Sequence, residues 1–447
     1  MTFLGIAAAW LLGGAWLEAT SRRGGLWTRV WNAAAGLPLG LGVTSFLYFV
    51  LTWAGVRSAL PQVALEAVAI AAGVYLWLRR GPLARERAPA GVGYVWALAI
   101  AAGIAWTLAL AAVMTMSSAL PHGDWDAWSI WNVRAKFLAG PGESWRHAVS
   151  PMFRSHPDYP LLLSGAVARL WRFSGSMDAS APAALALAFG ACVPAMLVSA
   201  LAVVRSTSMG WVASLLLVSG AGWLVEIPSQ YADVPLSAFI LAAVAAALMD
   251  RYTVAGVLIS CAAWTKNEGM VFALALVIAC AALRRDRIRE VLLGAAPGLI
   301  VVALFKAMLA PASEYGAHAP ELGRIVTILG SLWTETLNFG TGFAHPVIIA
   351  AALTVGLRFT MPAYLSVNWM PAVAACVVQC IGYLAAYLTT PADVAWQLST
   401  SLGRLMAQMW PVLVLLLVAA MRTLEEADPA PVASKQADTK QAKKRTH

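Results

Sequence analysis

Residues 92–117, VGYVWALAIAAGIAWTLALAAVMTMS, contain no charged side chain and decide the fold class. A hydrocarbon core about 30 Å thick takes roughly 20 apolar residues as a helix, so this stretch is long enough to cross a membrane. The 447-residue chain as a whole is 60% hydrophobic and only 12% charged, whereas a soluble protein carries about 25% charged residues. The sequence therefore predicts an all-α polytopic membrane protein. It excludes a soluble globular domain, a disordered protein and a nucleic-acid-binding module.

Apolar runs recur along the chain and predict about 13 transmembrane helices. They lie at 2–19, 31–54, 59–78, 92–117, 181–204, 210–226, 234–249, 254–264, 269–283, 290–310, 345–357, 363–388 and 405–422. The short runs, such as 254–264 and 345–357, are expected to be tilted, broken or re-entrant. We divide the chain into N-terminal transmembrane helices (1–90), a main transmembrane core (91–422) and a charged tail (423–447). The tail lacks apolar periodicity and is predicted to be a disordered cytoplasmic extension.

The distribution of basic residues predicts which ends of these helices face the cytoplasm. Arginine and lysine clusters follow the odd-numbered runs, as at 22–29, 79–87, 284–289 and 435–445, and such clusters sort to the cytoplasmic side. The opposite loops, 118–180, 226–233, 265–268, 311–344 and 389–404, are then extracytoplasmic. The loops 118–180 and 311–344 are the first and second large external loops.

The first external loop opens with PHGDWDAWSIWNVRAKF, residues 121–137. Asp124 and Asp126 alternate there with tryptophans, including Trp128. One interpretation is an aromatic belt at the membrane interface with two solvated acids. The other is a site in which flat rings pack against a sugar and a carboxylate acts as general base, or holds a divalent cation with its neighbour.

A second segment of this loop, HPDYPLLLSGAVARLWRF (156–173), adds His156 and Asp158. Asp158 is either a helix N-cap or a further member of the site. The residues after it predict an amphipathic helix lying along the interface, with Arg169 and Arg172 on its polar face.

Three later segments carry further polar residues on the same predicted side. Asp233 in EIPSQYADVPL (226–236) is either a helix cap or a site residue. Lys266 in WTKNEGMVF (264–272) breaks the positive-inside rule and needs a partner, either a phosphate or Glu268. Arg404 in TPADVAWQLSTSLGRLMAQMWP (390–411) could pair with Asp393 or meet a lipid phosphate.

These strings, in this order and on one side, resemble integral-membrane glycosyltransferases of the GT-C superfamily. The similarity is to bacterial proteins related to protein O-mannosyltransferases (glycosyltransferase family 39) and to lipid A aminoarabinose transferases, and it covers roughly residues 90–420. The resemblance implies a GT-C-like architecture with amphipathic helices in the first external loop. Two features depart from the family: an Asp-Trp-Asp sequence replaces the Asp-Glu pair of many relatives, and three extra helices precede residue 90.

The resemblance implies an enzyme of the bacterial inner membrane and cell envelope whose active site faces the periplasm. It would move a sugar from a polyprenyl-phosphate donor to a hydroxyl of a lipid, glycan or protein, with inversion. Asp126 is the expected catalytic base with Asp124 beside it. The expected substrate-binding residues are Asp158, Asp233, Lys266, Glu268, Arg404, Trp128 and His156. No cofactor is certain, and Mg²⁺ or Mn²⁺ at Asp124 and Asp126 stays open. The alternative is a transporter or flippase for a lipid-linked or anionic solute.

Overall fold

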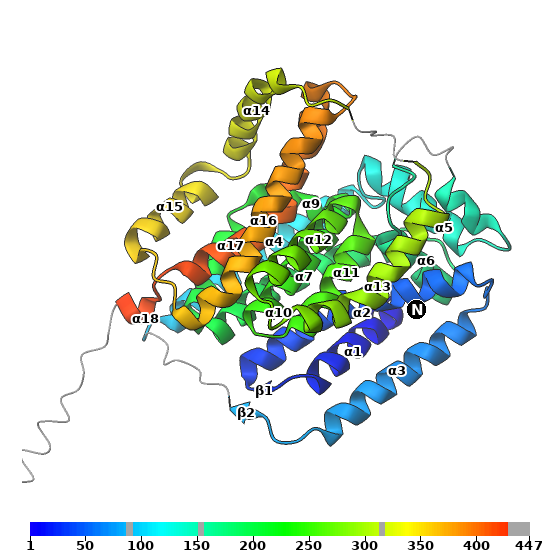
Figure 1. The fold of residues 1–447 in the computed structure, drawn as a ribbon, viewed down its shortest axis with the longest axis horizontal. Coiled ribbons are helices and arrows are strands. Elements are labelled where there is room, and N and C mark those ends of the chain that lie inside the picture. The colour runs from blue at the N-terminus through cyan, green and yellow to red at the C-terminus, as the bar shows by residue number, and fades with distance from the viewer. Residues whose placement is uncertain (86–92, 151–155, 313–317, 428–447) are drawn as a thin grey trace, which may run out of the picture.

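The structure, a computed structural model, describes residues 1–85, 93–150, 156–312 and 318–427, and these are almost entirely helical (Figure 1). The α-helices are α1 (Thr2–Ala19), α2 (Leu26–Trp53), α3 (Ala59–Arg79), α4 (Val95–Ala119), α5 (Val133–Ala139), α6 (Leu162–Ser174), α7 (Ser180–Val204), α8 (Thr207–Val218), α9 (Ala221–Ser229), α10 (Asp233–Leu248), α11 (Tyr252–Thr265), α12 (Asn267–Leu283), α13 (Ile288–Met308), α14 (Ile325–Asn338), α15 (Pro346–Leu357), α16 (Ala363–Thr389), α17 (Val394–Ala420) and α18 (Leu424–Ala427). A π-helix, η1 (Ala127–Asn132), and three 3-10 helices, η2 (Ser144–Val149), η3 (Leu322–Arg324) and η4 (Gly342–Ala344), lie between them. Two short strands, β1 (Arg23–Gly24) and β2 (Ala84–Arg85), pair in parallel.

The long apolar helices make the chain an all-α, multi-pass membrane protein. Within the described ranges, eight helices are long and apolar enough to cross a membrane, or nine if α8 and α9, bent by 70° at their junction, form one span. Four further apolar helices, α10, α11, α12 and α15, are shorter. The expected number of about 13 crossings stays a prediction, because length and composition alone do not decide whether the short helices cross.

Helices α1 and α2 pack so closely that glycine is needed at their contact. A Cβ atom on Gly40 would lie 1.7 Å from the carbonyl oxygen of Ala9, and one on Gly36 would lie 2.6 Å from the amide nitrogen of Gly14. Small residues spaced four apart allow such backbone approach between membrane helices. Helices α1 and α2 are therefore held together by direct backbone contact.

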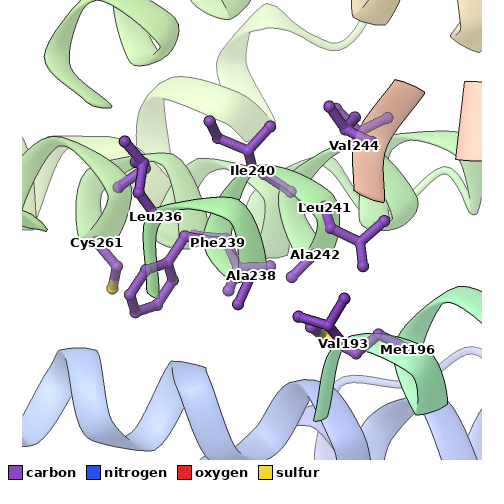
Figure 2. Packing of buried hydrophobic residues seen from close by; sticks show 14 of the residues in the cluster. Val193, Met196, Leu236, Ala238, Phe239, Ile240, Leu241, Ala242, Val244 and Cys261 are labelled. Atoms are coloured by element: carbon purple, nitrogen blue, oxygen red, sulfur yellow. The ribbon is translucent and has the colours of Figure 1, made fainter. Parts of the chain in front are cut away.

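Helix α10 is the centre of the core. Each of its 16 residues is buried, and an apolar helix buried on all sides carries no hydrophobic stripe. Figure 2 shows Leu236, Phe239 and Leu241 of this helix with Val193 of α7 and Cys261 of α11. The first residue of α10 is Asp233, so this packing fixes one acidic side chain in the middle of the molecule.

Helix α6 is not the interfacial helix that the sequence predicts, because it is buried in the protein. Residues 162–171 are all buried, and Arg169 has no exposed surface. Its Nε donates to Oε1 of Glu66 in α3 at 2.7 Å, and its Nη1 donates to the carbonyl of Gly5 at 3.0 Å. The arginine that was predicted to face the membrane surface instead neutralises a carboxylate inside the protein.

The start of the tail is also ordered, contrary to the prediction. Leu424–Ala427 form α18, Ser206 donates a hydrogen bond to Glu425 at 2.9 Å, and Arg205 lies 3.5 Å from Glu426. The rest of the predicted tail, 428–447, and the predicted domain boundary at residue 90 lie outside the described residues.

Candidate functional site

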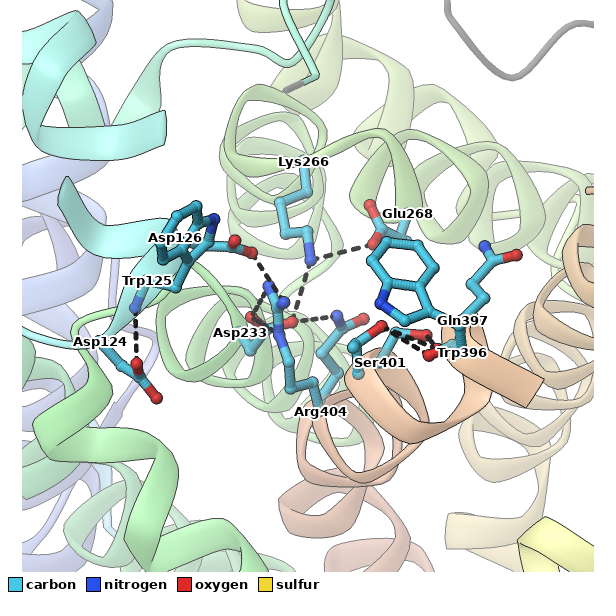
Figure 3. Close-up of polar contacts among 12 residues, drawn as sticks. Asp124, Trp125, Asp126, Asp233, Lys266, Glu268, Trp396, Gln397, Ser401 and Arg404 are labelled. Atoms are coloured by element: carbon cyan, nitrogen blue, oxygen red, sulfur yellow. Dashed lines mark hydrogen bonds and ion pairs between the residues drawn. The ribbon is translucent and has the colours of Figure 1, made fainter. Parts of the chain in front are cut away.

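Lys266 is the single residue between α11 and α12. It adopts an extended conformation, with φ −151° and ψ 165°, so that one helix stops and the next begins immediately. Its side chain is only 3% exposed, and its Nζ lies 3.0 Å from Oδ1 of Asp233 and 3.0 Å from Oε1 of Glu268 (Figure 3). The ion pair with Glu268, one of the two alternatives considered for Lys266, is thus present, and Asp233 is a second carboxylate partner.

Asp233 holds two cations at once. Its side chain is fully buried, and besides Lys266 it accepts hydrogen bonds from Nε and Nη2 of Arg404 at 3.1 and 3.0 Å, and from Nε2 of Gln408. The residue that precedes α10 is Ala232, and no side chain caps this helix end. Asp233 is therefore not the cap proposed as one interpretation. Its charge is turned toward the cations and toward the positive end of its own helix.

Arg404 connects this group to the first external loop. Its Nη1 lies 2.7 Å from Oδ2 of Asp126, and its guanidinium lies 4.4 Å from the ring centre of Tyr231. The interpretation that pairs Arg404 with Asp393 is wrong, because the Asp393 side chain accepts a hydrogen bond from the backbone of Trp396 and caps α17. A lysine, an arginine and three acids therefore form one cluster, which we call the charged cluster: Asp126, Asp233, Lys266, Glu268 and Arg404.

Asp124 and Asp126 differ in their surroundings. Oδ1 of Asp124 accepts a hydrogen bond from the backbone of Trp125 at 2.7 Å, and Figure 3 draws no interaction between its carboxylate and Arg404. Asp126 is followed directly by the π-helix η1, a type of helical defect that is frequent at functional sites. Of the two acids, only Asp126 reaches the charged cluster.

A second set of side chains adjoins the charged cluster through the next residue of the same turn. Asn267 donates to Oδ2 of Asp158 at 2.7 Å and accepts from Nζ of Lys306 at 2.7 Å, and Lys306 lies 3.2 Å from the same carboxylate oxygen. Asp158 is buried. Three consecutive residues, Lys266 to Glu268, thus bring the two sets together.

His156 and Trp128 occupy different positions relative to the cluster. The ring of His156 stacks on Tyr159, with centres 4.3 Å apart, and Nζ of Lys266 lies 5.7 Å from the centre of the Tyr159 ring. Burial lowers the pKa of His156 below its usual value, which favours the neutral form of its imidazole. Trp128 is largely exposed and makes an edge contact with Trp125. The structure places His156 at the site and Trp128 on the surface beside it.

Some residues of the site were not among the sequence candidates. Gln408 follows Arg404 by four residues, so it lies on the same face of α17. Lys306 is a lysine inside an apolar run, which in itself indicates a buried partner. Glu226, in the last turns of α9, leaves one carboxylate oxygen buried without a hydrogen-bond partner among the described residues.

The charge balance limits what this site can bind. Three carboxylates, those of Asp126, Asp233 and Glu268, face two cations, so the cluster has no spare positive charge for an anion. In the described ranges, no group of three or more His, Cys, Asp or Glu side chains is arranged to hold a metal ion. The divalent cation considered at Asp124 and Asp126 stays a prediction.

Comparisons with known proteins do not name a family. No family model, no curated protein and no solved structure matches the chain.

Proposed function

We propose that this protein is a GT-C-like glycosyltransferase of the bacterial inner membrane that uses a polyprenyl-phosphate-linked sugar at its extracytoplasmic face. The observation that supports this is the convergence of Asp126, Asp233, Lys266 and Arg404, which come from four distant stretches of sequence. Cations for a phosphate and a carboxylate for a hydroxyl are the groups that such a transfer needs. The acceptor is a hydroxyl of a lipid, glycan or protein.

The charge balance of the cluster leads to a specific order of events. An incoming donor phosphate can gain a cation only by displacing a carboxylate from it. Of the two carboxylates that Arg404 pairs with, Asp126 is the more easily displaced, since its side chain is 18% exposed and Asp233 is fully buried. Donor binding would thus move Arg404 from Asp126 to the phosphate and leave Asp126 free to accept a proton.

The reaction then follows with few steps. The acceptor oxygen attacks the anomeric carbon and its proton passes to the Asp126 carboxylate, while the bond from that carbon to the phosphate oxygen breaks. Polyprenyl phosphate leaves with the electron pair, and the anomeric configuration inverts. Because polyprenyl phosphate is a good leaving group, positioning and charge stabilisation carry most of the rate enhancement.

The test is turnover by the full chain in lipid with a panel of radiolabelled polyprenyl-phosphate sugars, measured as release of polyprenyl phosphate. Asp126→Asn should lower turnover at least ~100-fold, the low end of general-base contributions. Asp124→Asn is the matched comparison and should lose much less, because Asp124 lies outside the charged cluster. Normal turnover by folded Asp126→Asn would remove the proposed base, and no release with any donor would remove the proposed function.

Two helix breaks favour a second candidate, a transporter or flippase for a lipid-linked or anionic solute. Helices α8 and α9 are bent by 70°, and Lys266 interrupts two short apolar helices. Broken helices line substrate sites in many transporters. Uptake of a labelled lipid-linked sugar into proteoliposomes, without transfer of the sugar, would favour this candidate over the glycosyltransferase.

A further inference from the structure

A cavity lies at the base of the N-terminal helices, where the chain enters α2 and leaves α3. Its volume is about 750 Å³, and its lining includes Gly24, Leu26, Arg29, Trp77 and Arg80. In Figure 1 this is the region of β1 and β2. None of these residues belongs to the charged cluster.

The cavity lies at the opposite end of α10 from the charged cluster. Asp233 begins α10, and Arg251, just beyond its other end, donates to Oδ1 of Asn32 at 2.6 Å. Asn32 in turn donates to Glu18, which pairs with the cavity residue Arg80 at 3.0 Å. A helix of 16 residues is about 24 Å long, so the two regions lie at opposite ends of the central helix of the core.

The cavity carries an excess of positive charge. Within the described ranges, Arg80 pairs with one carboxylate, that of Glu18, and Arg251 is connected to Glu18 through Asn32. Arg29 is exposed, and within the described ranges its side chain makes no ion pair. Glu18 thus stands against the two arginines that line the cavity, Arg29 and Arg80, and the guanidinium of Arg29 is available to a ligand.

The surroundings of the cavity indicate that this ligand is amphiphilic. Leu26 and Leu78, which line it, are 69% and 75% exposed, and Trp77 is exposed beside them. Tryptophan prefers the level of the lipid headgroups. Helix α2 begins at the cavity without a side-chain cap, so its positive end adds to the attraction for an anion.

We propose that this cavity binds the phosphate of an anionic phospholipid headgroup, with Arg29 and Arg80 as its cationic ligands and the acyl chains lying along α3. Basic pockets between membrane helices bind such headgroups in this way. The arginine distribution predicts that the cavity faces the cytoplasmic leaflet. The site is separate from the proposed glycosyl transfer and does not depend on it.

The test is native mass spectrometry of the full chain in detergent with phosphatidylglycerol as the probe and phosphatidylcholine as the zwitterionic comparison. Arg29→Gln and Arg80→Gln should each weaken phosphatidylglycerol binding by about 5-fold. Arg358→Gln is the control, because Arg358 is another exposed arginine on the predicted cytoplasmic side and does not line this cavity. Arg29→Gln breaks no ion pair, so thermal unfolding should show an intact fold.

Three results would overturn the proposal. The first is equal phosphatidylglycerol binding by the Arg29→Gln and Arg358→Gln variants. The second is binding of phosphatidylcholine as tight as that of phosphatidylglycerol, since the cavity would then not select negative charge. The third is inorganic phosphate stabilising the wild type but not Arg29→Gln while phosphatidylglycerol does not bind, which would assign the cavity to free phosphate.

Discussion

Asp233 is the residue on which the stability of the charged cluster depends. It is fully buried and faces both Lys266 and Arg404. Removing one partner of a buried ion pair leaves an uncompensated charge, which costs about 3–5 kcal/mol. We expect Asp233→Asn to lower the free energy of unfolding by this amount, measured by thermal unfolding in detergent.

Asp126→Asn is the matched control for this stability effect. Asp126 is partly exposed and Arg404 keeps Asp233 as its partner, so the fold should lose less than about 1 kcal/mol, as for exposed pairs. Equal destabilisation by the two variants would contradict the distinction between a structural and a reactive carboxylate.

His156 should make stability depend on pH. Burial lowers the pKa of its folded imidazole, and the nearby charges of Glu268, Lys266, Asp126 and Asp158 modify this effect. As pH falls below about 6.5, the unfolded chain takes up the proton first, so the folded state loses stability. The melting temperature of the wild type should therefore fall more between about pH 7.5 and 5.5 than that of His156→Gln.

His147→Gln is the control for the pH experiment, since His147 is exposed. This variant should follow the wild type across the same pH range. If His156→Gln also followed the wild type, burial of His156 would not be coupled to folding.

At the residue scale, unusual residues were predictable and their partners were not. Lys266 was singled out because a lysine on the predicted extracytoplasmic side breaks the positive-inside rule, and Asp126 was singled out by the Trp-Asp-Ala-Trp string. That Arg404 pairs with Asp126 and not with Asp393 depends on how α17 packs against the first external loop. Residues 126 and 404 are far apart in the sequence, and no local pattern predicts that they are in contact.

At the scale of elements, the close contact of α1 with α2 is the most sensitive to a single methyl group. Gly40→Ala would place a Cβ atom 1.7 Å from the carbonyl oxygen of Ala9. Because that neighbour is backbone, the helices must separate, and we expect a loss of about 1–3 kcal/mol in thermal unfolding.

Gly103→Ala provides the comparison for this substitution. Gly103 also lies within an apolar helix, α4, but no atom of the described residues lies within 4 Å of a Cβ atom built there. Alanine favours helix over glycine, so this variant should be neutral or slightly more stable. Equal losses for the two alanines would show that helix contact is not the cause.

Helix α6 shows why an element can be predicted and its environment misjudged. Its periodicity predicts an amphipathic helix, and the helix is present. The partner of its polar face, Glu66, lies about a hundred residues earlier in α3. A polar stripe indicates only that a polar partner exists, and either water or a buried carboxylate can supply it.

For the whole molecule, the sidedness of the loops is the prediction that all functional proposals share. Ser176 lies in the first external loop and Arg285 lies in a basic cluster between α12 and α13, and both are exposed. Ser176→Cys should react with a membrane-impermeant maleimide in intact cells. Arg285→Cys should react only after the membrane is permeabilised.

The wild type, which has five cysteines of its own, sets the background of this labelling experiment. Labelling of Arg285→Cys in intact cells, with Ser176→Cys protected, would reverse the topology. The charged cluster would then face the cytoplasm, and an extracytoplasmic glycosyltransferase would be untenable.

The sequence by itself determined that the chain is a helical membrane protein and which polar stretches interrupt its apolar runs. Both follow from local composition, because a helix satisfies its own backbone and lipid excludes unpaired charge. The tertiary structure decided which charges meet. It joined Asp126 to Asp233 through Arg404, paired Asp233 with Lys266 as well, and placed Arg169 inside the protein. These pairings arise from the packing of helices that are distant in sequence, and no local pattern records them.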